Sequence, residues 1–91
     1  MSNVEAKAIL EDELRRYRSR SYSELVELLD EEYRAEMRGP SGATYQVEIQ
    51  LFWDDQPNGE LRVMGSIDDG GRRAFIPLTD GFVLAPNGTI R

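Results

Sequence analysis

The sequence predicts an α+β fold in which two N-terminal helices pack on an antiparallel meander sheet of four to five strands. Apolar residues recur at three- and four-residue spacings in the first third of the chain and alternate with polar residues afterwards. Clusters of Gly, Pro, Asn and Asp separate the alternating runs, so consecutive strands should be neighbours in the sheet. We expect a single domain over residues 1–91, helical in 1–30 and sheet in 31–91.

The first predicted helix spans Asn3–Arg18, with Ser2 and Glu5 at the spacing of a capping box. Its apolar stripe consists of Ala6, Ile9, Leu10, Leu14 and Tyr17. Three arginines close its last turn, namely Arg15, Arg16 and Arg18. These arginines could bind an anion or a nucleic acid, but acidic neighbours and the helix dipole favour a solvated face.

A second helix is predicted from residue 22 to about residue 30, opened by a capping box of Ser21 and Glu24. The next segment, Glu32–Arg38, fits either a strand or a continuation of that helix. The turn formers Gly39-Pro40-Ser41-Gly42 favour the strand, because a reversal there gives two apolar faces on one side. The expected pairs are Met37 with Ala43 and Ala35 with Tyr45.

Residues 43–53 form the clearest strand, with strict alternation of apolar and polar side chains. After the turn formers of residues 54–59, a third strand resumes the alternation. Pairing Trp53 with Leu61 sets Leu51 opposite Val63, Val47 opposite Ile67 and Ile49 opposite Gly65. The apolar residues of these two strands should form the core.

Asp69-Gly70 is a hairpin signal that predicts a fourth strand at residues 72–76. Ala74 would then face Gly65, and Ile76 would face Val63 in the core. Pro77 should end this strand because proline cannot donate a ladder hydrogen bond. A short fifth strand is predicted at residues 82–85.

Composition removes several function classes. The chain has no Cys and no His, which excludes thiol nucleophiles, histidine acid–base catalysis and thiolate or imidazole zinc sites. A net charge of −6 disfavours nucleic-acid binding, and no apolar run approaches the roughly 20 residues that cross a membrane. We therefore expect a cytoplasmic protein without cofactor, nucleic-acid or membrane binding.

Carboxylates provide the remaining candidate chemistry. The end of the meander that follows the second and fourth strands should gather four oxygen ligands of the kind Ca²⁺ or Mg²⁺ prefers: Asp54, Asp55, Glu60 and Asp80. Their spacing matches no known calcium loop, and Asp is also an ordinary turn residue. Turn chemistry is the stronger interpretation, so we assign no catalytic, cofactor or metal residue.

A possible interaction patch lies on the polar face of the predicted sheet. The Asp69-Gly70 turn would set Met64 directly opposite Phe75, with Phe52 diagonal to Met64. Three large apolar side chains on a polar face are typical of a contact surface, and dimerisation is the simplest version. The alternative is that the second helix or the segment 82–84 covers them as a second core.

Parts of the predicted sheet resemble small bacterial proteins of uncharacterised function; they are Tyr45 through Trp53-Asp54-Asp55, Gly65-Ser66-Ile67-Asp68-Asp69-Gly70-Gly71 and Pro77-Leu78. This resemblance implies no activity and no site residue. The sequence favours a small non-enzymatic protein-interaction module, acting on an unidentified protein partner or as a homodimer. The alternatives are an acidic inhibitor or immunity-type protein for a basic enzyme, and a carboxylate-dependent enzyme or metal-binding protein.

Overall fold

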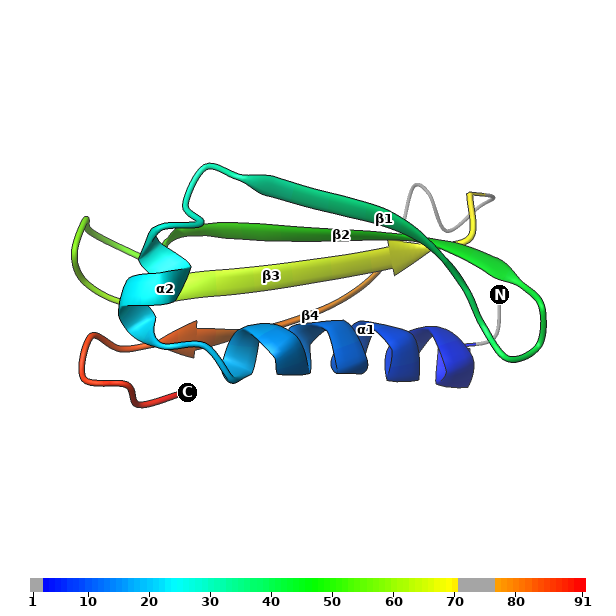
Figure 1. Ribbon diagram of the computed structural model, residues 1–91, viewed down its shortest axis with the longest axis horizontal. Helices are drawn as coiled ribbons and strands as arrows, with labels where there is room; N and C mark the ends of the chain where they lie inside the picture. Colours follow the sequence, from blue (N-terminus) through cyan, green and yellow to red (C-terminus); the bar gives the residue numbers. More distant parts are fainter. Residues whose placement is uncertain (1–2, 71–76) are drawn as a thin grey trace.

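The computed structural model describes residues 3–70 and 77–91, and its architecture is α+β (Figure 1). The elements follow in the order α1 (Asn3–Arg18), α2 (Tyr22–Val26), β1 (Glu32–Arg38), β2 (Thr44–Trp53), β3 (Leu61–Asp68) and β4 (Leu78–Leu84). The strands form one antiparallel sheet in the order β1-β2-β3-β4. The predicted meander is therefore confirmed, with four strands in the described part of the chain.

The helix α1 has the predicted bounds and packs against β3 and β4. In Figure 1 it runs along β4, whereas β1 lies at the far edge of the sheet. Gly65 of β3 provides the room for this contact, since a Cβ there would lie only 2.7 Å from the Cδ1 atom of Leu10. The predicted capping residue Ser2 lies outside the described residues.

The second helix is shorter than predicted. It begins after Ser21 with the expected capping box to Glu24, but it ends at Val26 rather than near residue 30. The residues after Val26 form tighter turns with i→i+3 hydrogen bonds. Asp30 then adopts a left-handed φ of 69°, which ends this series of turns before β1. Leu25 is the buried residue of this helix, and Glu32–Arg38 is a strand as predicted.

The register of β2 with β3 is the predicted one, with Trp53 opposite Leu61 and Ile49 opposite Gly65. The predicted register of β1 with β2 is wrong by two residues, because Met37 faces Tyr45 and not Ala43. Gly39 belongs to the ladder, where its N–H donates to the carbonyl of Ala43 at 2.8 Å. The loop therefore consists of residues 40–42 instead of 39–41, while the buried face stays the same.

The partner of β3 also differs from the prediction. Val63 faces Phe82 and Gly65 faces Asp80, rather than Ile76 and Ala74. The predicted strand at residues 72–76 lies outside the described residues, and the predicted fifth strand at residues 82–85 overlaps the end of β4. This pairing buries Phe82 and Leu84 on the helix side, the other members of that core being Ala6, Leu10, Leu14, Leu25, Tyr45, Val47, Ile49, Leu51, Leu61, Val63 and Ile67.

Candidate functional site

The candidate site is the outer face of the sheet, which we define as the side that points away from α1. Alternate residues of each strand face it, beginning with the charged side chains of β1 and the polar side chains of β2. Within residues 3–70 and 77–91, both helices contribute their buried residues to the opposite side. The outer face is thus where this part of the chain presents strand side chains directly to its surroundings.

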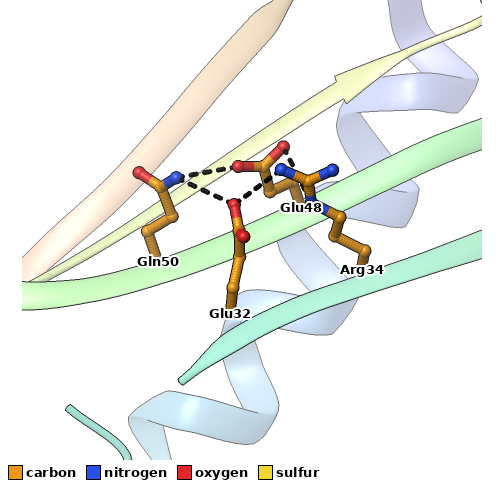
Figure 2. Close-up of polar contacts among 4 residues, drawn as sticks. All are labelled: Glu32, Arg34, Glu48 and Gln50. Carbon is orange, nitrogen blue, oxygen red and sulfur yellow. Dashed lines mark hydrogen bonds and ion pairs between the residues drawn. The ribbon is translucent and has the colours of Figure 1, made fainter. Parts of the chain in front are cut away.

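One half of the outer face carries a polar cluster of Glu32, Arg34, Glu48 and Gln50 (Figure 2). Nη2 of Arg34 donates to Oε1 of Glu32 at 2.8 Å, and its Nε lies 3.7 Å from Oε2 of Glu48. Nε2 of Gln50 donates to both carboxylates, at 2.8 Å to Glu48 and 3.3 Å to Glu32. The cluster ties β1 to β2 across the sheet.

The pKa values of the two carboxyl groups in this cluster, Glu32 and Glu48, shift in opposite directions. Hydrogen bonds from Arg34 and then from Glu48 hold the pKa of Glu32 below its ordinary value. Hydrogen bonding with Glu32, followed by desolvation, raises the pKa of Glu48. Such a split is expected where two carboxyl groups share one site and one of them carries the negative charge.

Beside this cluster, the outer face carries an apolar pair, Phe52 and Met64. Phe52 is 41% exposed and lies diagonally from Met64, as predicted, because Met64 pairs with Gln50 and Phe52 pairs with Arg62. A shallow depression of about 250 Å³ opens beside them and is lined by Glu48, Gln50, Phe52, Met64, Gly65, Ser66 and Thr79.

The predicted cross-strand pair of Met64 with Phe75 is wrong. The residue across from Met64 on β4 is Gly81, and a Cβ on Gly81 would lie 2.8 Å from the Met64 sulfur. The third member of the predicted patch, Phe75, lies outside the described residues. Phe52 and Met64 therefore form the apolar pair that the structure places together.

Of the four carboxylates predicted at one end of the sheet, Asp54, Asp55 and Glu60 lie in the β2–β3 loop, but Asp80 does not join them. Asp54 forms an ion pair with Arg62 at 2.6 Å between Oδ1 and Nε. Glu60 lies 2.6 Å from Nη2 of Arg91, in an ion pair whose geometry is not that of an aligned hydrogen bond. Asp80 lies in the middle of β4, opposite Gly65. No cluster of three acidic residues able to hold a metal ion occurs in residues 3–70 and 77–91.

The arginines at the end of α1 each have a neighbour in the structure. Arg15 pairs with Asp12 at 3.1 Å, and Arg16 lies 3.8 Å from Glu13. The guanidinium of Arg18 lies 5.2 Å from the ring centroid of Phe82, which is a cation–π distance. These contacts support the solvated interpretation of the arginine group over an anion site.

A second cavity, of about 320 Å³, lies where α1 ends beside β1, and sequence reasoning did not predict it. Its lining includes Glu13, which is only 5% exposed, and Tyr17, whose pKa is raised by burial. Glu13 occupies a position three residues after Leu10 on the apolar stripe. This acidic residue on an otherwise apolar stripe is the sequence feature that could have indicated the cavity.

Comparison with protein-family models, curated proteins and solved structures finds no match to this chain. Across the described residues, neither helix combines the length and the apolar character needed to span a membrane. The function must therefore be argued from the outer face itself.

Proposed function

We propose that this chain is a small non-enzymatic protein-interaction module that binds its partner through the outer face of the sheet. The observation that carries the proposal is the apolar pair, Phe52 and Met64, on a strand face that the described helices leave uncovered. Aromatic residues and methionine are enriched in protein–protein interfaces relative to the rest of the surface. The predicted patch included Phe75, and its share in the contact is part of the proposal.

The contacts of the carboxyl pair favour binding over catalysis. Glu32 and Glu48 are engaged with Arg34 and Gln50 on the exposed side of the sheet. A general acid or base must instead reach a substrate held in a shaped pocket. The cluster is better suited to fixing the shape of a contact surface.

The charge of the chain indicates the chemistry of the partner. The net charge is −6, and Glu48 lies at the rim of the depression beside Phe52. Complementary charge steers encounter and selects partners, while buried apolar groups supply most of the affinity. We therefore propose a partner that presents an apolar side chain surrounded by Lys or Arg.

An inhibitor or immunity-type protein for a basic enzyme is the second candidate, and the same net charge of −6 favours it. Its association would depend more steeply on salt, because charge would then dominate the contact. In the leading proposal the apolar pair dominates, so moderate salt should weaken the complex only slightly.

Capture from native cell extract with three matched baits tests the proposal. The baits are the wild type, Phe52→Lys on the outer face and Val4→Lys, where Val4 is an 83% exposed apolar residue of α1. Both variants add one positive charge, so they differ only in which surface is changed. The captured protein is then purified and its dissociation constant is measured for all three baits at low and high salt.

We expect the wild type and Val4→Lys to bind alike and Phe52→Lys to bind at least tenfold more weakly, as for an anchor residue. Equal binding by all three baits would remove the outer face as the contact. Equal loss by both variants would indicate a charge effect and favour the inhibitor alternative.

A further inference from the structure

Among the strands of residues 3–70 and 77–91, β1 is an edge of the sheet, since β2 is its one neighbour in the strand order. The N–H of Gly39, just after β1, donates to the carbonyl of Ala43, just before β2. This bond shows which residues of β1 direct their backbone groups toward β2. Successive residues of a strand direct their backbone groups to opposite edges. The N–H and C=O groups of four residues therefore point away from the sheet, namely those of Glu32, Arg34, Glu36 and Arg38.

The opposite edge is partly closed. The N–H of Val83 in β4 donates to the carbonyl of Arg91 at 3.2 Å, and the N–H of Arg91 donates back to Val83 at 2.8 Å. Ala85 and Thr89 continue this contact. In residues 3–70 and 77–91, β1 is thus the more open edge, and an open edge is a template for another strand.

The charges of one β1 strand are complementary to those of a second β1 strand that runs antiparallel to it. Its outer-face residues alternate in sign, in the order Glu32, Arg34, Glu36, Arg38. In an antiparallel pair of two β1 strands centred on Ala35, Glu32 of each copy faces Arg38 of the other. Arg34 of each copy likewise faces Glu36, so all four cross-strand pairs join opposite charges.

This register is the one that the backbone also allows. The four charged residues carry the outward N–H and C=O groups, and the register pairs them with one another on both strands. A shift by two residues keeps the hydrogen bonds but sets Arg34 against Arg34 or Glu36 against Glu36. A shift by four residues again joins opposite charges, but in only two pairs. The charge pattern therefore favours the register centred on Ala35, which forms four such pairs.

The helix side of β1 supports the same pairing. Tyr33, Ala35 and Met37 face that side and are only half-buried, because α1 packs over β3 and β4. In Figure 1 neither of the two described helices runs along β1. The same register sets Tyr33 against Met37 of the other copy and Ala35 against itself, which would cover these apolar groups further.

We propose that two copies of this chain pair through β1 to form one continuous antiparallel sheet. The contact has two-fold symmetry, so a single self-complementary strand suffices. The contact keeps the outer faces of both copies on the same side of the joined sheet. The proposal does not rest on partner binding at Phe52, and either can fail without the other.

Sedimentation over a concentration series tests the pairing with reciprocal charge variants. Glu36→Arg and Arg34→Glu each turn two attractive cross-strand pairs into two repulsive ones. We expect each variant alone to raise the dimer dissociation constant about tenfold or more. An equimolar mixture of the two variants restores opposite charges at both pairs, so the mixture should form a heterodimer.

Two controls separate this result from other causes. Arg15→Glu changes an exposed arginine of α1 and should leave dimerisation unchanged, as should Phe52→Lys. Because Arg34 also contacts Glu32 and Glu48, the folding of each variant is checked by circular dichroism, and Glu32→Arg with Arg38→Glu supplies a second reciprocal pair.

A heterodimer from the mixture, with weakened homodimers, would support the pairing. A wild type that stays monomeric throughout the series would overturn it and would show that the charges of β1 protect the edge. A dimer broken by Phe52→Lys but not by Glu36→Arg would move the contact to the outer face and equally overturn the pairing.

Discussion

The hydroxyl of Tyr45 donates a hydrogen bond of 2.8 Å to the carboxylate of Glu5, across 40 residues of sequence. The backbone N–H and the hydroxyl of Ser41 donate to the same carboxylate at 3.0 and 2.7 Å. These contacts attach the first turn of α1 to the β1–β2 hairpin. Hydrogen bonds from Ser41 and then Tyr45 hold the pKa of Glu5 below its ordinary value.

Acid should weaken this attachment. Because the pKa of Glu5 is lowered in the folded state, its contribution to stability is present above the ordinary value of 4.5 and is lost as pH falls through the lower folded value. Glu5→Gln should therefore reduce the melting temperature near neutral pH, and the difference from wild type should shrink in acid. The exposed Glu11→Gln is the control, and an equal pH dependence for both variants would contradict the assignment.

Gly65 should not tolerate a side chain. A Cβ there would lie 2.7 Å from Leu10 and 3.0 Å from Ile49, which forces α1 or β2 to shift. We expect Gly65→Ala to lower the free energy of unfolding by about 1 to 3 kcal/mol, the usual cost of overpacking. Urea denaturation beside Ser66→Ala measures this. A neutral or stabilising Gly65→Ala would mean that α1 does not pack closely on β3.

The inward face of β2 should carry much of the stability. Ile49 is fully buried and Leu51 nearly so, in contact with the rest of the core. Ile49→Ala or Leu51→Ala should cost about 2 to 5 kcal/mol, and Gln50→Ala on the outer face should cost far less. A loss under about 0.5 kcal/mol at Ile49 would mean that the two faces of the strand are exchanged.

Sequence patterns predicted the pairing of β2 with β3 because inward-facing apolar residues recur at every second position of both strands. The turn formers of residues 54–59 between the strands then set the register. The register of β1 with β2 was harder, since a shift by two residues keeps every side chain on its own face. This register depends on whether Gly39 pairs with Ala43 or lies in the loop, and the turn formers alone do not determine that. Glu13 shows the same limit of pattern reasoning, because its burial depends on where α1 meets the rest of the fold.

The partner of β3 was mispredicted because Asp69-Gly70 is a strong local hairpin signal. Burial of Phe82 and Leu84 beside Val63 and Leu61 is a tertiary contribution that local turn chemistry does not contain. The same change in pairing moves Asp80 to mid-strand and removes the predicted cluster of carboxylates. An error in one strand pairing therefore accounts for an error in a candidate site.

Divalent cations should leave the melting temperature nearly unchanged. Asp54 and Glu60 are each paired with an arginine, and Asp80 lies mid-strand, so no ready-made cage of oxygen ligands results. A cation that bound the folded state would stabilise it by mass action. A clear rise in melting temperature with millimolar Ca²⁺ or Mg²⁺, abolished by Asp54→Asn or Asp80→Asn, would contradict this prediction.

Amide hydrogen exchange at low and high protein concentration tests most directly whether two copies of this chain pair through β1. If β1 pairs with a second copy, the amides of Arg34 and Glu36, which point away from β2, are protected at high concentration and lose protection on dilution. The amide of Ala35, which points toward β2, should stay protected throughout and serves as the internal control. Fast exchange at Arg34 and Glu36 that does not change with concentration would contradict the account.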